Sequence, residues 1–117
     1  MSYWREPRKR QTKYRNIPCD YNGHHFDSIK ERDYYISLLW LEKAGEIHDI
    51  QLQVPFELQP AFKHNGKTIR AIKYIADFTY LDRDGKMHIV DTKGFHTEKY
   101  EIKKKMMLYH GWEIEER

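Results

Sequence analysis

The end of the last predicted central strand carries Asp91-Thr92-Lys93, a carboxylate and an amine separated by one residue. Side chains two positions apart on a strand point to the same face, so we expect Asp91 and Lys93 to project into one space. A carboxylate is a hard oxygen ligand for Mg²⁺, and a neighbouring lysine can orient an attacking water and stabilise charge that develops on a phosphate. The pair predicts metal-assisted phosphate hydrolysis, and the alternative is a solvated ion pair at a strand end.

Asp77 is a second carboxylate that can join this pair, depending on the turn between its strand and the next. If Arg83-Asp84-Gly85 is a three-residue loop with Gly85 left-handed, counting back along the hairpin places Asp77 directly opposite Asp91 and on the same face. A two-residue loop would instead place Asp77 opposite Thr92, and the two carboxylates would point to opposite faces. The simpler alternative for Asp77 is a charge on an edge strand.

Glu31 is the third acidic candidate, near the start of the first predicted helix. Helical periodicity puts it in the middle of an apolar stripe formed by Tyr34, Tyr35, Leu38, Leu39 and Leu41. Burying a carboxylate there without a cation or a hydrogen-bond donor would cost several kcal/mol of free energy or force its protonation. A metal ion bound by Glu31 would explain the burial. The alternative is that Glu31 completes a capping box with Ser28.

The elements that position these residues follow from capping signals, turn signals and the spacing of apolar residues. Asn22-Gly23 predicts a short hairpin, Gly45 ends the first helix, and Pro55 indicates an edge strand or a bulge. Residues 60–67 are expected to be a polar loop. The predicted elements are a hairpin over 18–26, a helix over 28–44, strands over 50–58, 68–81 and 86–93, a helix over 97–109 and a strand over 112–115. This order predicts an α/β fold with a mixed sheet.

Length and composition predict one folded domain over residues 17–117. The chain of 117 residues is 39% hydrophobic and 33% charged, which is too apolar for a disordered protein and too polar for a membrane protein. No apolar run approaches the length of a spanning helix, and the single cysteine, Cys19, excludes an internal disulfide, so we expect a cytoplasmic protein. The histidines lack zinc-site spacing and no Gly-rich phosphate loop occurs, so neither a zinc site nor a nucleotide cofactor is expected.

Positive charge is concentrated in residues 1–16, where six basic residues stand against one acid. Such an arm can contact phosphates, and the alternative is a solvated leader that keeps the protein soluble. The second helix is expected to have an apolar face of Ile102, Met106 and Tyr109 with lysines around it. The candidate nucleic-acid-binding residues are Arg8, Lys9, Arg10 and Lys13 in the arm and Lys99, Lys103 and Lys104 on this helix.

The order of the acids is similar to that of a known superfamily. An acid in the first helix, then Asp77, then Asp91-Thr92-Lys93 in the following strand resembles the PD-(D/E)XK nucleases, including archaeal-type Holliday junction resolvases. Four segments also resemble a small phage and prophage family of uncharacterised nuclease-like proteins, namely residues 26–31, 41–47, 53–58 and 74–78. The resemblance extends from about Tyr21 to Trp112, and the basic arm lies outside it.

The resemblance implies an αβββαβ restriction-endonuclease-like core that holds Mg²⁺ or Mn²⁺ mainly through Asp77 and Asp91. It implies that Glu31 is a further ligand or water anchor and that Lys93 lies beside the nucleophilic water. Ala76 stands where the superfamily has a proline, which touches no metal. The expected function is a DNA endonuclease for branched or structured DNA, such as Holliday junctions, in phage replication or recombination, and a homodimer would suit symmetric cutting. The alternative is a non-catalytic nucleic-acid-binding or regulatory protein on a nuclease scaffold.

Overall fold

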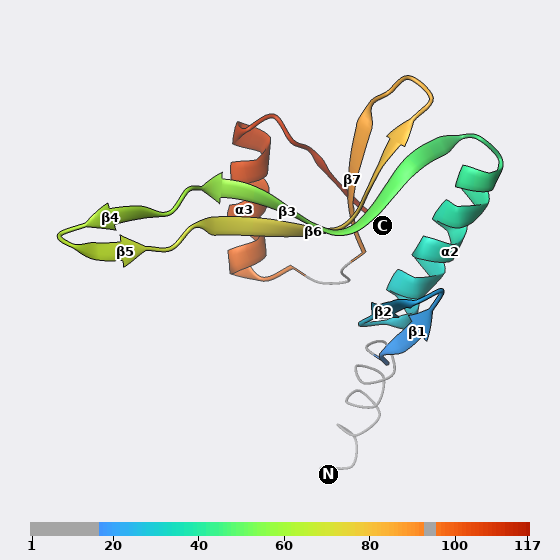
Figure 1. Ribbon diagram of the computed structural model, residues 1–117, viewed down its shortest axis with the longest axis horizontal. Coiled ribbons are helices and arrows are strands. Elements are labelled where there is room, and N and C mark those ends of the chain that lie inside the picture. Colours follow the sequence, from blue (N-terminus) through green and yellow to red (C-terminus); the bar gives the residue numbers. More distant parts are fainter. Residues whose placement is uncertain (1–16, 93–95) are drawn as a thin grey trace, which may run out of the picture. The chain divides into compact units, whose positions relative to one another are not determined.

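The computed structural model describes residues 17–92 and 96–117 of the chain. The chain forms two compact units, which divide between Lys43 and Ala44. Figure 1 shows their helices and strands. In the described ranges, no helix combines the length and the hydropathy that a membrane crossing requires. The single domain over residues 17–117 stays a prediction.

The first unit contains a hairpin and a helix. Its elements are β1 (Cys19–Tyr21), β2 (His24–Phe26) and α2 (Ile29–Lys43). The two strands pair antiparallel around Asn22-Gly23. The ring centroid of Phe26 lies 5.3 Å from that of Tyr35, so the hairpin and the helix share a small aromatic core. The predicted hairpin and the predicted first helix are confirmed.

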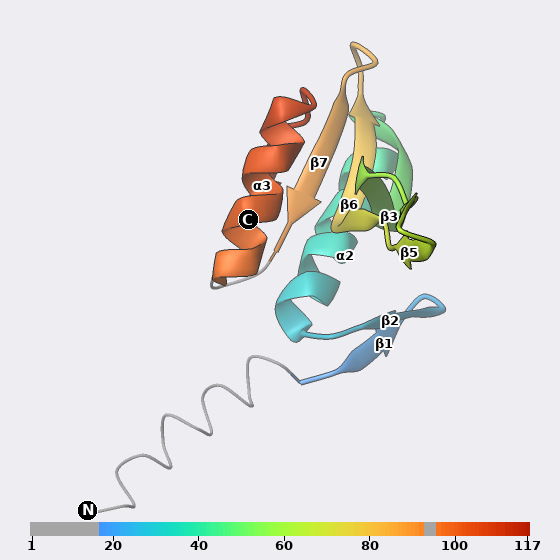
Figure 2. The same ribbon diagram turned by 90° about the vertical axis from the view of Figure 1, so that its left-hand side faces the viewer.

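The second unit is built on a mixed four-stranded sheet. Its strands are β3 (Ile47–Gln59), β6 (Ile72–Asp82), β7 (Met87–Asp91) and β8 (Ile114–Glu116). They lie in the order β3-β6-β7-β8, with two antiparallel pairings followed by a parallel pairing of β7 with β8. Helix α3 (Glu98–Tyr109) connects β7 to β8 and packs on the sheet (Figure 2). The α/β fold with a mixed sheet is confirmed, and the helices and the strands of this sheet follow the predicted order of helix, three strands, helix and strand.

The segment between β3 and β6 contains another hairpin, where we expected a polar loop. Strands β4 (Phe62–His64) and β5 (Lys67–Ile69) pair antiparallel across Asn65-Gly66. Both turn residues have positive φ, +50° for Asn65 and +76° for Gly66, which is the backbone of the tight turns that match strand twist. The single strand predicted over residues 68–81 is therefore wrong, because β5 and β6 divide this segment between them.

Strand β3 lies at an edge of the sheet, as Pro55 indicated. It begins at Ile47, three residues earlier than predicted. Phe56 and Leu58 are buried while Glu57 between them is exposed, so the predicted alternation is confirmed in this half of the strand.

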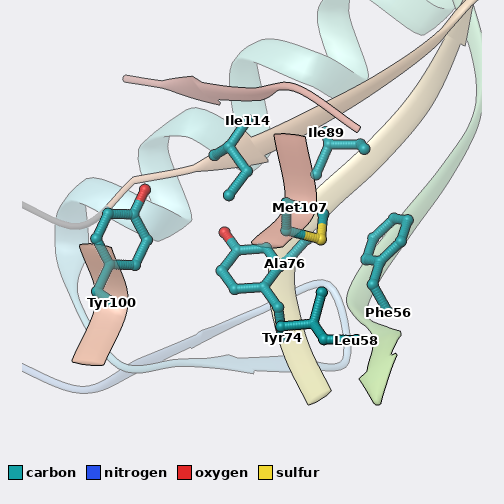
Figure 3. Packing of buried hydrophobic residues seen from close by; sticks show 8 residues of the cluster. All are labelled: Phe56, Leu58, Tyr74, Ala76, Ile89, Tyr100, Met107 and Ile114. Carbon is teal, nitrogen blue, oxygen red and sulfur yellow. The ribbon is translucent and has the colours of Figure 1, made fainter. Parts of the chain in front are cut away.

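One face of the sheet packs against α3 in an apolar cluster. Its buried members are Phe56, Leu58, Tyr74, Ala76, Ile89, Tyr100, Met107 and Ile114 (Figure 3). Thr97 caps α3 as predicted, because its hydroxyl accepts a hydrogen bond from the backbone N–H of Tyr100. The predicted apolar face of α3 is wrong for Ile102 and Tyr109, which are exposed, whereas Met106 packs against the cluster beside the buried Tyr100 and Met107.

His88 on β7 links the two neighbouring strands of the sheet. Its Nε2 lies 2.8 Å from Oδ2 of Asp82 on β6, and its Nδ1 contacts Oε2 of Glu115 on β8. The ring of Tyr80 stacks on the imidazole at 4.9 Å between centroids. The hydrogen bond with Asp82 raises the pKa of His88; burial opposes this shift, and the bond with Glu115 adds to it.

The protein is expected to lose stability as the pH rises through the raised pKa of His88. A group whose pKa is higher in the folded than in the unfolded chain contributes stability that is complete below the unfolded value of about 6.5 and is lost as the pH passes the folded value. The free energy of unfolding in urea should fall as the pH rises above about 6.5, more steeply for the wild type than for His88→Gln. His48→Gln, at an exposed histidine, is the control. Identical pH dependence in the wild type and His88→Gln would contradict this expectation.

Candidate active site

The turn between β6 and β7 has the three-residue form that brings Asp77 and Asp91 to adjacent positions. Gly85 has a φ of +82°, and the backbone N–H of Asp82 donates to the carbonyl of Lys86 at 3.0 Å. Continuing the register of the two strands by one residue beyond the last pair places Asp77 across from Asp91. Of the two turns that the sequence left open, the structure has the three-residue form, and the strand pairs as far as Phe78 with Val90 follow the corresponding register. Two acidic residues therefore lie on neighbouring central strands of the sheet.

Asp91 ends β7 and is completely buried. The hydroxyl of Tyr74, on β6, donates a hydrogen bond of 2.7 Å to its Oδ2. Burial is the main cause that raises the pKa of Tyr74, followed by this hydrogen bond and the charge of Asp91, and the charge of Asp77 contributes as well. Tyr74 is therefore a neutral donor at physiological pH, and both carboxylates act on its hydroxyl.

Asp77 is held by the residue that follows Asp91 in the chain. The backbone N–H and the side-chain hydroxyl of Thr92 both donate to Oδ2 of Asp77, each at 2.9 Å. The side chain of Asp77 is nearly buried, with 7% of the residue exposed, and Thr92 is buried too. Two donors on one oxygen fix the direction of this carboxylate, so each acid of the pair is oriented by a different side chain.

The backbone of β3 is irregular beside Asp77. The pairing of Val54 with Ala76 puts Gln53 across from Asp77. Gln53 has a φ of +53°, in the left-handed region that residues with a Cβ seldom adopt. Residues with a left-handed or bulged backbone occur often next to functional sites, where they change the direction of the strand.

A second hydrogen-bond network lies next to the first, where β8 ends. The hydroxyl of Tyr100 donates to Oε2 of Glu116 at 2.7 Å, and its ring centroid lies 6.3 Å from that of Tyr74. Glu116 pairs with Asp91 in the parallel ladder, and its Oε2 lies 2.9 Å from Nε2 of His96. The bond from Tyr100 is the main cause that lowers the pKa of Glu116. Glu116 is therefore an ionised carboxylate beside the strand that carries Asp91.

Glu31 lies in the first unit, in the first turn of α2. Its backbone N–H donates to the Ser28 hydroxyl at 3.1 Å, and its Oε1 accepts from the backbone N–H of Asp27 at 3.1 Å. The capping interaction with Ser28 is confirmed, although the side chain reaches back to Asp27 instead of the capping residue itself. Glu31 is buried, as its place in the apolar stripe predicted. Its role as a metal ligand stays a prediction.

The basic residues that were predicted to take part in catalysis or nucleic-acid binding fall into two groups. Lys93 and, in the arm, Arg8, Lys9, Arg10 and Lys13 lie outside the described residues. On α3, Lys99 is exposed. Lys103 donates to the carbonyl of Lys73 at 2.7 Å, and Lys104 lies 3.3 Å from Oε1 of Glu116. Two of the three helix lysines thus contact the sheet, and their binding to nucleic acid stays a prediction.

The two carboxylates on β6 and β7 suit a hard divalent cation. In proteins, Mg²⁺ is commonly held by one or two carboxylates, with water and substrate phosphates filling the remaining positions. Asp77 and Asp91 offer those two carboxylates. Over residues 17–92 and 96–117, no group of three or more His, Cys, Asp or Glu side chains is placed to hold a metal. The two carboxylates are oxygen donors of the kind that Mg²⁺ and Mn²⁺ take.

Sequence reasoning missed Tyr74 and Thr92, the two residues that orient the carboxylates. For Thr92 strand alternation gives no signal, because it would place the Thr92 side chain on the face opposite to Asp91 and Asp77. Thr92 lies just after the end of β7, and its hydroxyl contacts Asp77 there. For Tyr74 no spacing rule applies, because its long side chain reaches Asp91 away from any direct cross-strand pair.

Nearly the whole chain matches a described family. Residues 11–116 match the family described as protein of unknown function, DUF1064. No curated protein and no solved structure matches the chain. The matched range includes β6, β7, α3 and both central carboxylates. The chain therefore belongs to the DUF1064 family.

Proposed function

We propose that this protein is a metal-dependent nuclease that hydrolyses phosphodiester bonds in DNA. The observation that carries the proposal is the burial of Asp77 and Asp91 at adjacent positions of two central strands. Neighbouring carboxylates repel each other when both are ionised, and a divalent cation that they share removes this repulsion. The hydrogen bonds from Thr92 and Tyr74 orient both carboxylates, as ligands of a catalytic ion need.

The roles of the residues follow from their chemistry. Asp77 and Asp91 would hold Mg²⁺ or Mn²⁺ through carboxylate oxygens. When bound, such an ion lowers the pKa of water and neutralises charge on a phosphate. Lys93, two residues after Asp91, would orient the attacking water. The water oxygen forms a bond to phosphorus while the bond to one sugar oxygen breaks, which leaves a phosphate monoester and a sugar hydroxyl.

The choice of DNA rests on the order of the site residues. Asp77 followed by Asp91-Thr92-Lys93 resembles the PD-(D/E)XK nucleases, and the resemblance to Holliday junction resolvases supports branched DNA as the preferred substrate and a homodimer as the working form. We place this activity in the cytoplasm, in phage replication or recombination.

Metal removal is expected to abolish cleavage. Purified protein with labelled linear, flapped and four-way DNA should nick at least one substrate in Mg²⁺ or Mn²⁺ and none in EDTA, because the ion activates the water. Calorimetric titration with Mn²⁺ should show binding by the wild type and none by the double variant Asp77→Asn/Asp91→Asn. If neither Mn²⁺ binding nor nicking occurs on any substrate, the proposal is wrong and a non-catalytic nucleic-acid-binding protein is favoured.

A further inference from the structure

The β4–β5 hairpin extends from the β3–β6 pair beyond the four-stranded sheet (Figure 1). Gln59 pairs with Ile72 at its base. Every residue from Ala61 to Arg70 is exposed, and the main contacts of the hairpin are between its own two strands. The packing of the second unit therefore does not explain the side chains that the hairpin carries.

The hairpin is basic and has no acid beside it in the sequence. Between Glu57 and Asp77 the chain contains no Asp or Glu. The same interval contains Lys63, His64, Lys67, Arg70 and Lys73. Such a run of uncompensated cations on an exposed segment favours an anionic partner.

Cations occur on both faces of the hairpin. The cross-strand pairs are Phe62 with Ile69, Lys63 with Thr68, and His64 with Lys67. Directly opposed residues share a face and successive residues alternate, so Lys67 lies on one face and Lys63 on the other. Phe62 and Ile69, 49% and 38% exposed, form an apolar pair on the face of Lys67.

We propose that this hairpin enters the major groove of duplex DNA, an inference that rests on the proposed nuclease function. The major groove, about 12 Å wide, admits a two-stranded ribbon whose strands lie about 4.8 Å apart. Both walls of the groove are phosphate backbones, so cations on the two faces of the ribbon meet both DNA strands. The pair Phe62 and Ile69 suits contact with thymine methyl groups. Single-stranded DNA is disfavoured, because its binding relies on several stacked aromatic side chains and the hairpin has only Phe62.

The length of the ribbon relates this contact to the carboxylates. Lys67 precedes Asp77 by ten residues, which span at most about 33 Å along extended strands. One turn of duplex DNA is about 34 Å. The hairpin would therefore hold the duplex within about one helical turn of the phosphate at Asp77 and Asp91.

Two lysines provide a matched test of the hairpin. Lys67 and Lys86 are both exposed and each follows the glycine of a tight turn, but only Lys67 belongs to the β4–β5 hairpin. Binding to a fluorescent duplex of about three helical turns is measured by anisotropy in EDTA, on wild-type protein and on Lys67→Glu and Lys86→Glu. Lys67→Glu is expected to weaken binding about tenfold and to lower the salt slope by about 1, whereas Lys86→Glu changes neither.

A shortened chain gives a second measurement that does not depend on one lysine. Replacing residues 60–71 with Asn-Gly joins the paired residues Gln59 and Ile72 by a tight turn. This variant should melt as the wild type does and bind the duplex at least as weakly as Lys67→Glu. Four results would each overturn the inference. The first two are equal losses of binding in Lys67→Glu and Lys86→Glu, and wild-type binding by the shortened chain. The other two are tighter binding of single strands than of duplex, and no duplex binding at all.

Cleavage assays separate this inference from the proposed function. If the wild type cleaves DNA and the Lys67→Glu variant binds duplex as tightly as the wild type, the hairpin inference alone is wrong. If duplex binding depends on Lys67 but Asp77→Asn cleaves as fast as the wild type, the assignment of the carboxylates alone is wrong.

Discussion

Asp77→Asn is expected to reduce metal-dependent DNA cleavage at least about a thousandfold, because several kcal/mol of metal stabilisation correspond to several factors of ten in rate. Asparagine removes the charge of the ligand while keeping its size. Its amide oxygen can still accept the two hydrogen bonds from Thr92, so the sheet should retain its register. The measurement is the initial rate of nicking of a labelled substrate with enzyme in excess, in saturating Mn²⁺.

Thermal melting separates the loss of the metal site from a loss of the fold. In EDTA the Asp77→Asn variant should melt close to the wild type, since the amide oxygen can still accept both hydrogen bonds from Thr92. Added Mn²⁺ should raise the melting temperature of the wild type alone, because a ligand stabilises only a protein that binds it. Asp84→Asn, at an exposed residue of the turn between β6 and β7, is the control and should cleave DNA at the wild-type rate. Cleavage by Asp77→Asn at the wild-type rate would remove Asp77 from the site.

Local signals reduced the placement of the two central acids to two alternatives, which differ in the length of one turn. Gly85 specifies a left-handed residue at the end of the turn, and the strand pairing that follows brings Asp77 across from Asp91. The cap at Thr97 was predictable for the same reason, because a capping hydroxyl contacts a backbone group only three residues away. Features that depend on neighbours in the sequence are readable from it.

Features that depend on contacts between residues far apart in the sequence could not be predicted from it. On α3 the predicted face of Ile102, Met106 and Tyr109 was wrong for its two outer members. The packed side includes Lys103, whose ammonium group reaches the carbonyl of Lys73, so this side does not look apolar in the sequence. The Asn65-Gly66 turn was visible, but the strands it joins are three residues each and lack an apolar alternation. The hydrogen bonds that orient the carboxylates also depend on the folded sheet.

Tyr74→Phe is expected to weaken Mn²⁺ binding and to slow cleavage by about 10- to 100-fold. The substitution removes only the hydroxyl that donates to Oδ2 of Asp91 and keeps the ring in the apolar cluster. Without this donor, Asp91 loses the contact with Tyr74 that holds its carboxylate toward the ion, so the ion is bound less well although no ligand has been removed. Calorimetric titration with Mn²⁺ and nicking rates at several Mn²⁺ concentrations measure the effect, and raised Mn²⁺ should recover part of the rate.

Tyr100→Phe is the matched control for Tyr74→Phe. It removes another buried tyrosine hydroxyl from the same cluster, but one that donates to Glu116 instead of Asp91. Each substitution should lower the free energy of unfolding by about 1 kcal/mol, the usual contribution of one hydrogen bond. A purely structural role for both tyrosines would change Mn²⁺ affinity equally in the two variants. A selective loss in Tyr74→Phe identifies Tyr74 as the residue that positions Asp91, whereas wild-type Mn²⁺ affinity in Tyr74→Phe would show that Asp91 needs no such support.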